Sequence, residues 1–561
     1  MADILLSTLN ARYIHSAFGL RYLLANLGDL QSRAEILEFE VSQEVSEIVE
    51  RILLASPRIV GLGVYIWNIV KTTEVVATLK RVAPEIQVII GGPEVSYDSE
   101  HEKIVQDADY VVAGEGEFVF RSLCREILLG ESPSPEYLPV SATSEAQSEL
   151  LVTHPAGKFR SGGLPPLDQI QLPYHLYTDQ DIRHRVVYIE ASRGCPFTCE
   201  FCLSSVDVPV RSYDTDRILE QLELLYERGL RTFKFVDRTF NLNIRTASRI
   251  LQFFLDRMQP GLFIHFEMVP DRFPPQLREL VKKFPAGSLQ FEVGIQSFNP
   301  EVGKHISRRQ DFPKIAENLQ FLRQETGVYI HADLIVGLPG EDLPSFATGF
   351  DTLVAMDPHE IQVGILKRLK GTPIVRHDSE FRMQYSDTPP YEILSNSHLT
   401  FFEVQKMRRF ARFWDLIANS GNFIDAKKLI WEGDSSPFAA FLELTEWLFQ
   451  RLGRKVSVSL KSLSSNLFVF LTENKGLPAE RVGRILAEDY LRGGRRDLPD
   501  VLVPFIDREE IRERYSKARA GIEPHTQGGS TDKSESSGAI TRPLPKHQPL
   551  KRQKRVGLDA M

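Results

Sequence analysis

Short apolar runs alternate with amphipathic stretches along the first 130 residues. Stretches with helical spacing, such as residues 20–27 and 70–82, separate the runs. The apolar runs are residues 4–9, 35–39, 59–64, 88–90 and 110–112. Alternation of strands and helices is typical of a parallel sheet covered on both faces. We therefore expect residues 1–135 to form an α/β domain, a Rossmann-like, doubly wound sheet of five parallel strands that binds a ligand at the strands' carboxyl ends.

A second series of alternating runs follows a linker. Residues 136–182 are rich in proline, serine and glycine, which is typical of a linker. In residues 183–394 the alternation resumes and predicts a barrel or a partial (β/α)6 barrel. Its apolar runs are residues 186–191, 233–236, 263–268, 289–295, 330–336 and 361–366. The periodicity alone does not distinguish six strands from eight.

The pattern becomes purely helical near residue 395. Residues 401–417, 438–448 and 482–491 are apolar at helical spacing, so we expect a helical C-terminal domain over residues 395–515. Residues 516–561 are polar, rich in glycine and serine, and basic near their end, which predicts a disordered tail. The basic end could attract an anionic partner, although a solvated tail explains it more simply.

Composition narrows the class of protein. The chain has 561 residues and a formal net charge of −8, which disfavours a surface that coats nucleic acid. No apolar run is long enough for a transmembrane helix, and the first residues do not resemble a signal peptide, so no membrane partner is expected. The chain has 4 cysteines, and three of them lie close together, unlike a secreted disulfide framework. We expect a cytoplasmic protein.

The strongest chemical signal is the segment R-G-C-P-F-T-C-E-F-C at residues 193–202. It follows a predicted strand and therefore lies on a βα loop, where barrels place their active sites. Three thiolates on one loop can hold three irons of a 4Fe–4S cluster and leave the fourth iron open. Two other interpretations remain: a zinc site, which would need Cys124 or a distant histidine as its fourth ligand, and three unrelated free cysteines.

The spacing C-x3-C-x2-C after a first barrel strand resembles the signature of the radical SAM superfamily. There, S-adenosylmethionine (SAM) chelates the open iron, and an electron from the cluster cleaves it to methionine and a 5′-deoxyadenosyl radical. The resemblance implies Cys195, Cys199 and Cys202 as cluster ligands. It also implies Phe201 as an aromatic contact to adenine.

Three further segments resemble motifs of the same superfamily, and each ends a predicted strand. In F-V-D-R-T-F-N, Asp237 is a candidate contact to the amino group of SAM. In E-V-G-I-Q-S, Glu292 and Gln296 are candidate contacts to its ribose or carboxylate. In D-L-I-V-G-L-P-G-E, Gly337 and Gly340 would let the backbone approach a ligand closely. A structural role for any one of these residues is an equally simple explanation when it is taken alone.

The N-terminal domain resembles a cobalamin-binding domain. Gly91 and Gly92 follow the fourth predicted strand, and Gly114 and Gly116 follow the fifth. Glycines there would let the nucleotide tail of cobalamin lie on the backbone, although a tight turn is the simpler explanation of Gly91-Gly92-Pro taken alone. The D-x-H-x-x-G motif that ligates cobalt from below is not matched near His15, so we expect no histidine beneath the cobalt.

Residues 1–380 together resemble the B12-binding class of radical SAM proteins, and the helical domain resembles an uncharacterised extension of some members. The resemblance implies a 4Fe–4S cluster, SAM and cobalamin as cofactors, and an external electron donor of the flavodoxin or ferredoxin type. The leading hypothesis is methyl transfer to an unactivated carbon of an unknown substrate: one SAM methylates cobalt, and a second yields the radical that activates the substrate. A non-methylating rearrangement or oxidation, and a non-catalytic cobalamin or cluster sensor, are the alternatives. No further catalytic residue is identified.

Overall fold

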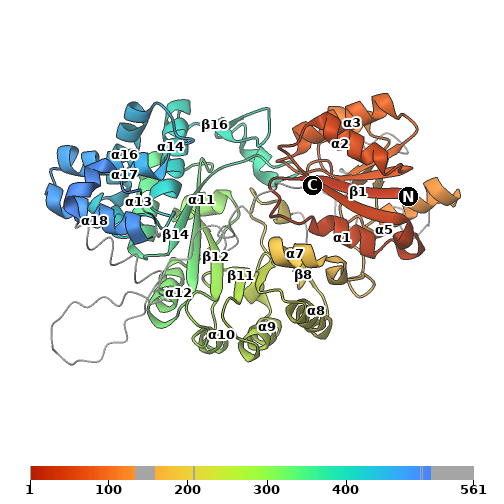
Figure 1. Ribbon diagram of the computed structural model, residues 1–561, viewed down its shortest axis with the longest axis horizontal. Helices are drawn as coiled ribbons and strands as arrows, with labels where there is room; N and C mark the ends of the chain where they lie inside the picture. Colours follow the sequence, from red (N-terminus) through yellow and green to blue (C-terminus); the bar gives the residue numbers. More distant parts are fainter. Residues whose placement is uncertain (1, 133–157, 206–208, 493–494, 496, 507–561) are drawn as a thin grey trace.

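The computed structural model describes residues 2–132, 158–205, 209–492, 495 and 497–506. The chain forms an N-terminal sheet domain, an open half-barrel and a group of C-terminal helices (Figure 1). Among these residues, no helix combines the length and the apolar character needed to span a membrane. The tail predicted at 516–561 lies outside the described residues. The predicted domain boundaries stay predictions.

The N-terminal sheet has six parallel strands in the order β2-β1-β3-β4-β5-β6. They are β1 Ile4–Asn10, β2 Ala34–Glu40, β3 Ile59–Gly63, β4 Gln87–Gly91, β5 Tyr110–Ala113 and β6 Phe159–Ser161. The first five match the five predicted runs, so the doubly wound α/β class is confirmed. Strand β6 was not predicted, because three residues are too few to show a period, and it adds a short edge beside β5.

Helices cover both faces of this sheet. One face carries α1 Phe18–Ala25 and α5 Glu117–Leu129, and the other carries α2 Val45–Leu54, α3 Ile69–Val82 and α4 Lys103–Asp107. Every residue of β1 is buried. A strand buried on both sides shows no alternation of apolar and polar residues, and the hydroxyls of its buried Ser7 and Thr8 donate to the carbonyls of Leu37 and Gly63.

The half-barrel is a second parallel sheet of six strands, in the order β14-β13-β12-β11-β10-β7. The strands are β7 Val187–Ile189, β10 Thr232–Phe235, β11 Phe263–Met268, β12 Leu289–Gln296, β13 Tyr329–Val336 and β14 Glu360–Ile365. Six strands, rather than eight, confirm the partial barrel. Its helices are α7 Asp179–His184, α8 Thr215–Glu227, α9 Ile244–Asp256, α10 Pro275–Val281, α11 Pro300–His305, α12 Phe312–Glu325 and α13 Leu343–Ala355.

The strands of the half-barrel bury only one face. Along β12, buried and half-buried residues alternate without interruption, and β13 follows nearly the same pattern. The buried residues belong to the main hydrophobic core together with those of α9, α12 and α13. The half-buried residues line the concave side of the sheet, where side chains can meet a ligand.

The C-terminal helices extend the core of the half-barrel. They are α14 Phe401–Ile417, α15 Ala426–Leu429, α16 Pro437–Leu452, α17 Leu460–Val469 and α18 Ala479–Arg492, which confirms the predicted helical region. Phe350 of α13 packs edge-on against Phe410 and Trp414 of α14, with ring centroids 5.1 and 4.8 Å away. One continuous core therefore joins the helices to the sheet.

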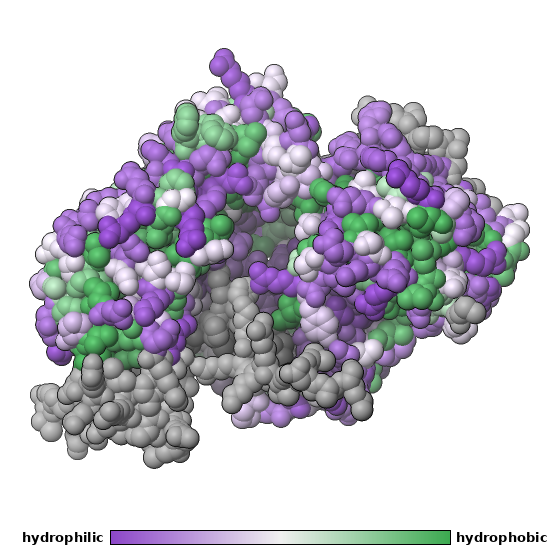
Figure 2. All heavy atoms as spheres, turned by 45° about the horizontal axis from the view of Figure 1, so that its top comes forward, coloured by the Kyte–Doolittle hydropathy of each residue, from purple (hydrophilic) through white to green (hydrophobic). Residues whose placement is uncertain are grey.

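An irregular segment, residues 366–397, connects β14 to α14. It contains the 3₁₀ turn η6 Pro373–His377 and a hairpin of β15 Gln384–Tyr385 with β16 Ile393–Ser395. In Figure 1, β16 lies between the C-terminal helices and the N-terminal domain. The space-filling view shows a hollow between these two lobes (Figure 2).

Candidate functional site

The cysteine loop, residues 193–202, follows β7 at the carboxyl edge of the half-barrel. Arg193 pairs with Arg211 through the two-residue strands β8 Ser192–Arg193 and β9 Arg211–Ser212. Cys195 and Cys199 are buried, and Cys202 is half-buried. The amide of Cys202 donates to the carbonyl of Cys199 at 3.0 Å, so the last two cysteines share one turn. The structure thus brings the three predicted thiols together on a βα loop.

The spacing of the three sulfurs distinguishes a single ion from a cluster. Thiolates about 2.3 Å from one zinc ion lie about 3.8 Å from each other. Within the described part of the chain, the group of three His, Cys, Asp or Glu ligand atoms that all lie within 4.8 Å of one another is Glu292, His331 and Asp333. The three sulfurs are therefore farther apart than one ion requires. A cluster, in which each thiolate binds its own iron, fits this donor set better.

Cys124, the remaining cysteine of the chain, lies in the core of the N-terminal domain. It is fully buried in α5 and packs in the apolar cluster that includes Phe120 and Leu123. Burial raises the pKa of its thiol far above the usual value. Cys124 is therefore a core residue, and the zinc interpretation loses its other cysteine.

Sequence reasoning missed Arg308, which contacts the cysteine loop. Its Nη1 donates to Sγ of Cys199 at 3.2 Å, and its Nη2 donates to the carbonyl of Gly294 in β12. Arg308 therefore ties the cysteine loop to strand β12. The sequence offered only the basic pair Arg308-Arg309, a pattern that is common on surfaces.

Asp237 lies at the carboxyl end of β10 and anchors the start of the cysteine loop. Its carboxylate accepts hydrogen bonds from the amide of Ala191 at 2.9 Å and from Oγ of Ser192 at 2.6 Å. Burial raises the pKa of Asp237 to about 6, although these two donors act in the opposite direction. The predicted contact to the amino group of SAM stays a prediction, and the structure gives Asp237 a second role in holding the loop.

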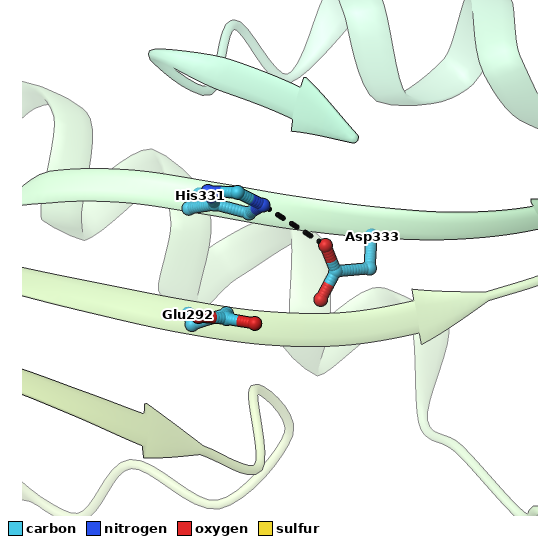
Figure 3. Close-up of side chains that lie close together, drawn as sticks. All are labelled: Glu292, His331 and Asp333. Carbon is cyan, nitrogen blue, oxygen red and sulfur yellow. Dashed lines mark hydrogen bonds and ion pairs between the residues drawn. The ribbon is translucent and has the colours of Figure 1, made fainter. Parts of the chain in front are cut away.

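Glu292 lies deeper on the concave face, beside residues of the next strand (Figure 3). Its carboxylate pairs with Nε2 of His265 at 3.0 Å, while Nε2 of His331 pairs with Asp333 at 3.0 Å. Burial alone would raise the pKa of Glu292, but the hydrogen bond from His265 and the two imidazoles lower it to about 2. Glu292, His331 and Asp333 lie close enough to share one ion, yet each is already paired within the protein.

These groups border a cavity of about 760 Å³ that opens toward the amino ends of the strands. The loops before β11 and β12, residues 258–262 and 285–288, form its apolar rim. Lys234 and Gln290 line its wall together with Glu292 and His331. The half-barrel therefore offers a polar interior in which hydroxyl, amine or carboxylate groups of a ligand could be bound.

Gln296 and Gly337 lie at the carboxyl ends of their strands, nearer to the cysteine loop. Gln296 ends β12 with a φ of 73°, and its Oε1 is buried with no hydrogen-bond partner in the described structure. Gly337 has a φ of 94°, and a Cβ there would lie 2.6 Å from Cγ2 of Ile393. Phe201 is half-buried against the main core. The unsatisfied oxygen of Gln296 fits the predicted SAM contact, which stays a prediction for all three residues.

The four glycines predicted to cradle cobalamin have different neighbours. A Cβ on Gly92, at a φ of 117°, would lie 2.5 Å from the carbonyl oxygen of Val64. Cβ atoms on Gly91 and Gly116 would lie 3.1 and 3.2 Å from atoms of Val112. Gly114, at a φ of 76°, has no atom within 4 Å of its Cβ position. Close packing within the domain thus accounts for three of the glycines, and Gly114 leaves an open backbone surface where a ligand could lie.

The glycine-containing loop after β5 directly contacts the cysteine loop. Arg193 donates to Glu115 at 2.8 Å and lies 2.7 Å from Glu117, and Arg211 also pairs with Glu115. All four side chains are largely buried. Buried ion pairs are costly to break, so these contacts hold the two loops side by side.

Comparisons with known proteins agree with this arrangement. A B12 binding domain model matches residues 5–123, a Radical SAM superfamily model matches residues 189–348, and a model of a protein of unknown function (DUF4080) matches residues 379–530. The first match includes five of the six strands of the N-terminal sheet, and the second includes most of the half-barrel. The third begins within the segment between β14 and α14.

The individual relatives share less than 30% sequence identity with this chain. The uncharacterized methyltransferase PH0819 of Pyrococcus horikoshii is 28% identical over 53% of this chain and 64% of its own length. The cobalamin-dependent radical SAM methyltransferase TokK of Streptomyces tokunonensis is 24% identical over 56% of this chain and 48% of its own length. This chain therefore spans less than two thirds of either relative.

The fold has a counterpart among solved structures. The cobalamin-dependent S-adenosylmethionine radical enzyme OxsB with aqua-cobalamin bound matches with a TM-score of 0.57 and 15% identity, over 92% of this chain and 84% of that chain. At this identity the match shows a shared fold. The chain thus combines a segment that matches the B12 binding domain, a segment that matches the Radical SAM superfamily and a C-terminal region of unknown function.

Proposed function

We propose that this chain is a cobalamin-dependent radical SAM methyltransferase that acts on an unactivated carbon of a polar small molecule. The observation that carries the proposal is the contact between the cysteine loop and the loop after β5, made by Arg193 with Glu115 and Glu117. Two loops that would each hold a metal cofactor are thereby kept adjacent. The relatives named as methyltransferases support the choice of reaction.

When bound, a 4Fe–4S cluster supplies the electron that cleaves SAM, and cobalamin supplies a methyl carrier. Cys195, Cys199 and Cys202 would hold the cluster, and Arg308 would orient Cys199 through its hydrogen bond to the sulfur. Gly114 would present bare backbone to cobalamin. The polar wall of the half-barrel would orient the substrate, because its imidazole and carboxylate groups can bind hydroxyl and amine groups.

The cluster also requires a source of electrons. We expect an external donor of the flavodoxin or ferredoxin type and a reducing compartment such as the cytoplasm, where thiolates and clusters persist. The N-terminal domain, which ion pairs hold against the cysteine loop, would keep water away from the cofactors, as radical chemistry requires.

The test is anaerobic reconstitution of the full chain with iron, sulfide and hydroxocobalamin, followed by detection of SAM-derived products. The wild-type protein should release 5′-deoxyadenosine and S-adenosylhomocysteine. Cys199→Ala should lose the absorbance of the cluster and the release of 5′-deoxyadenosine together, because a thiolate ligand is gone. Cys124→Ala, a matched change of a buried cysteine outside the loop, should keep both.

Each other outcome contradicts a particular part of the proposal. If the protein releases 5′-deoxyadenosine and never S-adenosylhomocysteine, it does not transfer methyl, and a rearrangement or oxidation takes the place of methylation. If the reconstituted, reduced protein does not cleave SAM, it is a sensor. If Cys199→Ala behaves like Cys124→Ala, the cysteine loop does not hold the cluster.

A further inference from the structure

The segment between β14 and α14, residues 366–397, touches three loops that surround the proposed cofactors. We call it the bridging segment. It lies after the matched Radical SAM residues and enters the region of unknown function partway along its length. Neither family match assigns it a role. Its contacts are made by side chains that are far apart in sequence from their partners.

The first contact holds the cysteine loop. Glu200 lies between Cys199 and Cys202 and is 2% exposed. Its carboxylate pairs with Nε2 of His377 at 2.9 Å and with Arg376, and its carbonyl accepts from the amide of Ile374 at 3.0 Å. Together with the hydroxyl of Ser307, the 3₁₀ turn η6 thus pairs a buried carboxylate in the middle of the cysteine motif.

The second contact holds the loop after β4 in the N-terminal domain. Glu94, which is 4% exposed, follows the predicted cobalamin glycines. The hydroxyl of Tyr391 donates to Oε1 of Glu94 at 2.6 Å. Lys370 lies 3.4 Å from the same oxygen and donates to Glu102 at 2.7 Å. Both partners of this buried carboxylate therefore come from the bridging segment.

The backbone of the bridging segment fits the same loop closely. The amide of Gly371 donates to Asp98 at 3.2 Å, and a Cβ on Gly371 would lie 2.5 Å from the ring of Tyr97. Tyr391 has a φ of 54°, a left-handed conformation that a residue other than glycine keeps only when its surroundings hold it. The fit is specific in shape as well as in charge.

The third contact holds the loop after β13. Ile393 is fully buried against Gly337, and the side chain of Asn396 donates to the carbonyl of Gly337 at 3.3 Å. A single segment therefore touches the cysteine loop, the loop after β13 and the loop after β4 of the other domain. Buried carboxylates are costly unless they are paired, so the first two contacts, at Glu200 and Glu94, strongly favour one relative position of the loops.

We propose that the bridging segment sets the position of the loop after β4 relative to the cysteine loop. Tyr391 and Lys370 are positioning residues for the first loop, and His377 is a positioning residue for the second. This inference rests on the proposed function only in assigning cofactors to the two loops. It gives the first part of the region of unknown function a task, which is to align the B12-binding domain with the half-barrel.

The first test measures hydrogen exchange of backbone amides in the full chain without cofactors, so its result does not depend on whether SAM is cleaved. Tyr391→Phe, alone and with Lys370→Met, should speed exchange in residues 92–102 roughly tenfold or more, because a charged hydrogen bond is lost. Tyr226→Phe is the matched control. It removes one tyrosine hydroxyl on the outer helix α8, which donates to the carbonyl of Arg257 at 2.9 Å and also contacts the side-chain amide of Gln259.

A conservative variant separates positioning from mere stability. Glu94→Gln keeps a carbonyl oxygen for Tyr391 and should exchange more like the wild type than Glu94→Ala does. Unchanged exchange in residues 92–102 of the double variant would overturn the proposal. So would an equal rise across the whole N-terminal sheet, because the contacts would then only stabilise that domain.

The second test uses the reconstituted protein and a spectroscopic distance. The magnetic interaction between cob(II)alamin and the reduced cluster falls steeply with their separation. In the Tyr391→Phe, Lys370→Met variant this interaction should become weaker and more widely distributed than in the Tyr226→Phe control, at equal iron and cobalamin content. An interaction identical to that of the control would show that the bridging segment does not set the alignment.

Discussion

The described part of the chain contains two parallel sheets of six strands each, and they differ in how many faces they bury. Helices cover both faces of the N-terminal sheet, and all of β1 is buried. In the half-barrel, β12 alternates between buried and half-buried residues, and its second face lines a cavity. The first sheet can therefore meet a ligand only through loops at its edge. The second can use side chains along its strands as well as its loops.

The largest expected effect tests this difference directly. Leu5 and Leu6 are neighbours in β1 and both fully buried, so Leu5→Ala and Leu6→Ala should each lower the free energy of unfolding by about 2–5 kcal/mol. In β12, Phe291→Ala should cost about 3–5 kcal/mol, whereas Gln290→Ala, on the cavity face, should stay within about 0.5 kcal/mol. Denaturant midpoints of the four variants measure this. Equal costs at Phe291 and Gln290 would contradict the one-faced packing of the half-barrel.

A smaller effect tests the loops at the edge of the N-terminal sheet. Gly92→Ala should destabilise the protein by about 2–3 kcal/mol, because the new Cβ meets the carbonyl of Val64 at a positive φ. Gly114→Ala should cost only about 1 kcal/mol, since open space surrounds its Cβ position. Thermal unfolding checks the stability of both variants.

Cobalamin binding gives a second test of the loops that contain Gly92 and Gly114. If Gly114 presents bare backbone to cobalamin, Gly114→Ala should weaken hydroxocobalamin binding, measured by titration of the folded protein. Gly130→Ala is a matched control, because Gly130 also has a positive φ and an open Cβ position but lies at the end of α5. Equal binding by Gly114→Ala and Gly130→Ala would remove Gly114 from the cobalamin site.

A further expected effect concerns the half-barrel and appears as a pH dependence. Burial raises the pKa of Asp237 from 3.8 to about 6, so between these values the folded chain binds a proton that the unfolded chain has released. Stability should therefore fall as the pH rises from about 4 to 6, by about 2–3 kcal/mol for this group, and then level off. Asp237→Asn should flatten that part of the curve.

Unfolding midpoints at several pH values between 4 and 8 measure this dependence. Glu267 and Glu341, whose pKa values burial raises to about 7, should keep the remaining slope at higher pH. Identical slopes in the wild type and in Asp237→Asn between pH 4 and 6 would show that folding does not raise the pKa of Asp237.

Much of the fold could be predicted because most strands have a recognisable pattern of consecutive apolar and polar residues. Buried strands such as β4 contain an uninterrupted apolar run, and half-buried strands such as β12 alternate, so both patterns are visible in the sequence. The cysteine loop was equally accessible, because its three thiols lie within one short segment. Strand β6 was missed, since its pairing with β5 depends on where the chain returns.

The candidate site was less predictable wherever two strands or two domains meet. Glu292 and Gln296 belong to one motif, yet Glu292 pairs with His265 in the interior, while Gln296 ends the strand with a buried, unsatisfied oxygen. Gly92 and Gly114 looked alike in the sequence, but only the neighbouring strand shows which one is needed for packing.

The sequence by itself determined the two sheets, the helical region and the cysteine loop, because periodicity and short motifs are properties of consecutive residues. Only the tertiary structure decided that Arg308 lies on Cys199, that Arg193 joins the two domains and that Tyr391 reaches Glu94. These contacts link residues that are far apart along the chain. Which residues become partners depends on the tertiary fold and on the need to pair buried charges. Neither is visible in a short segment of the sequence.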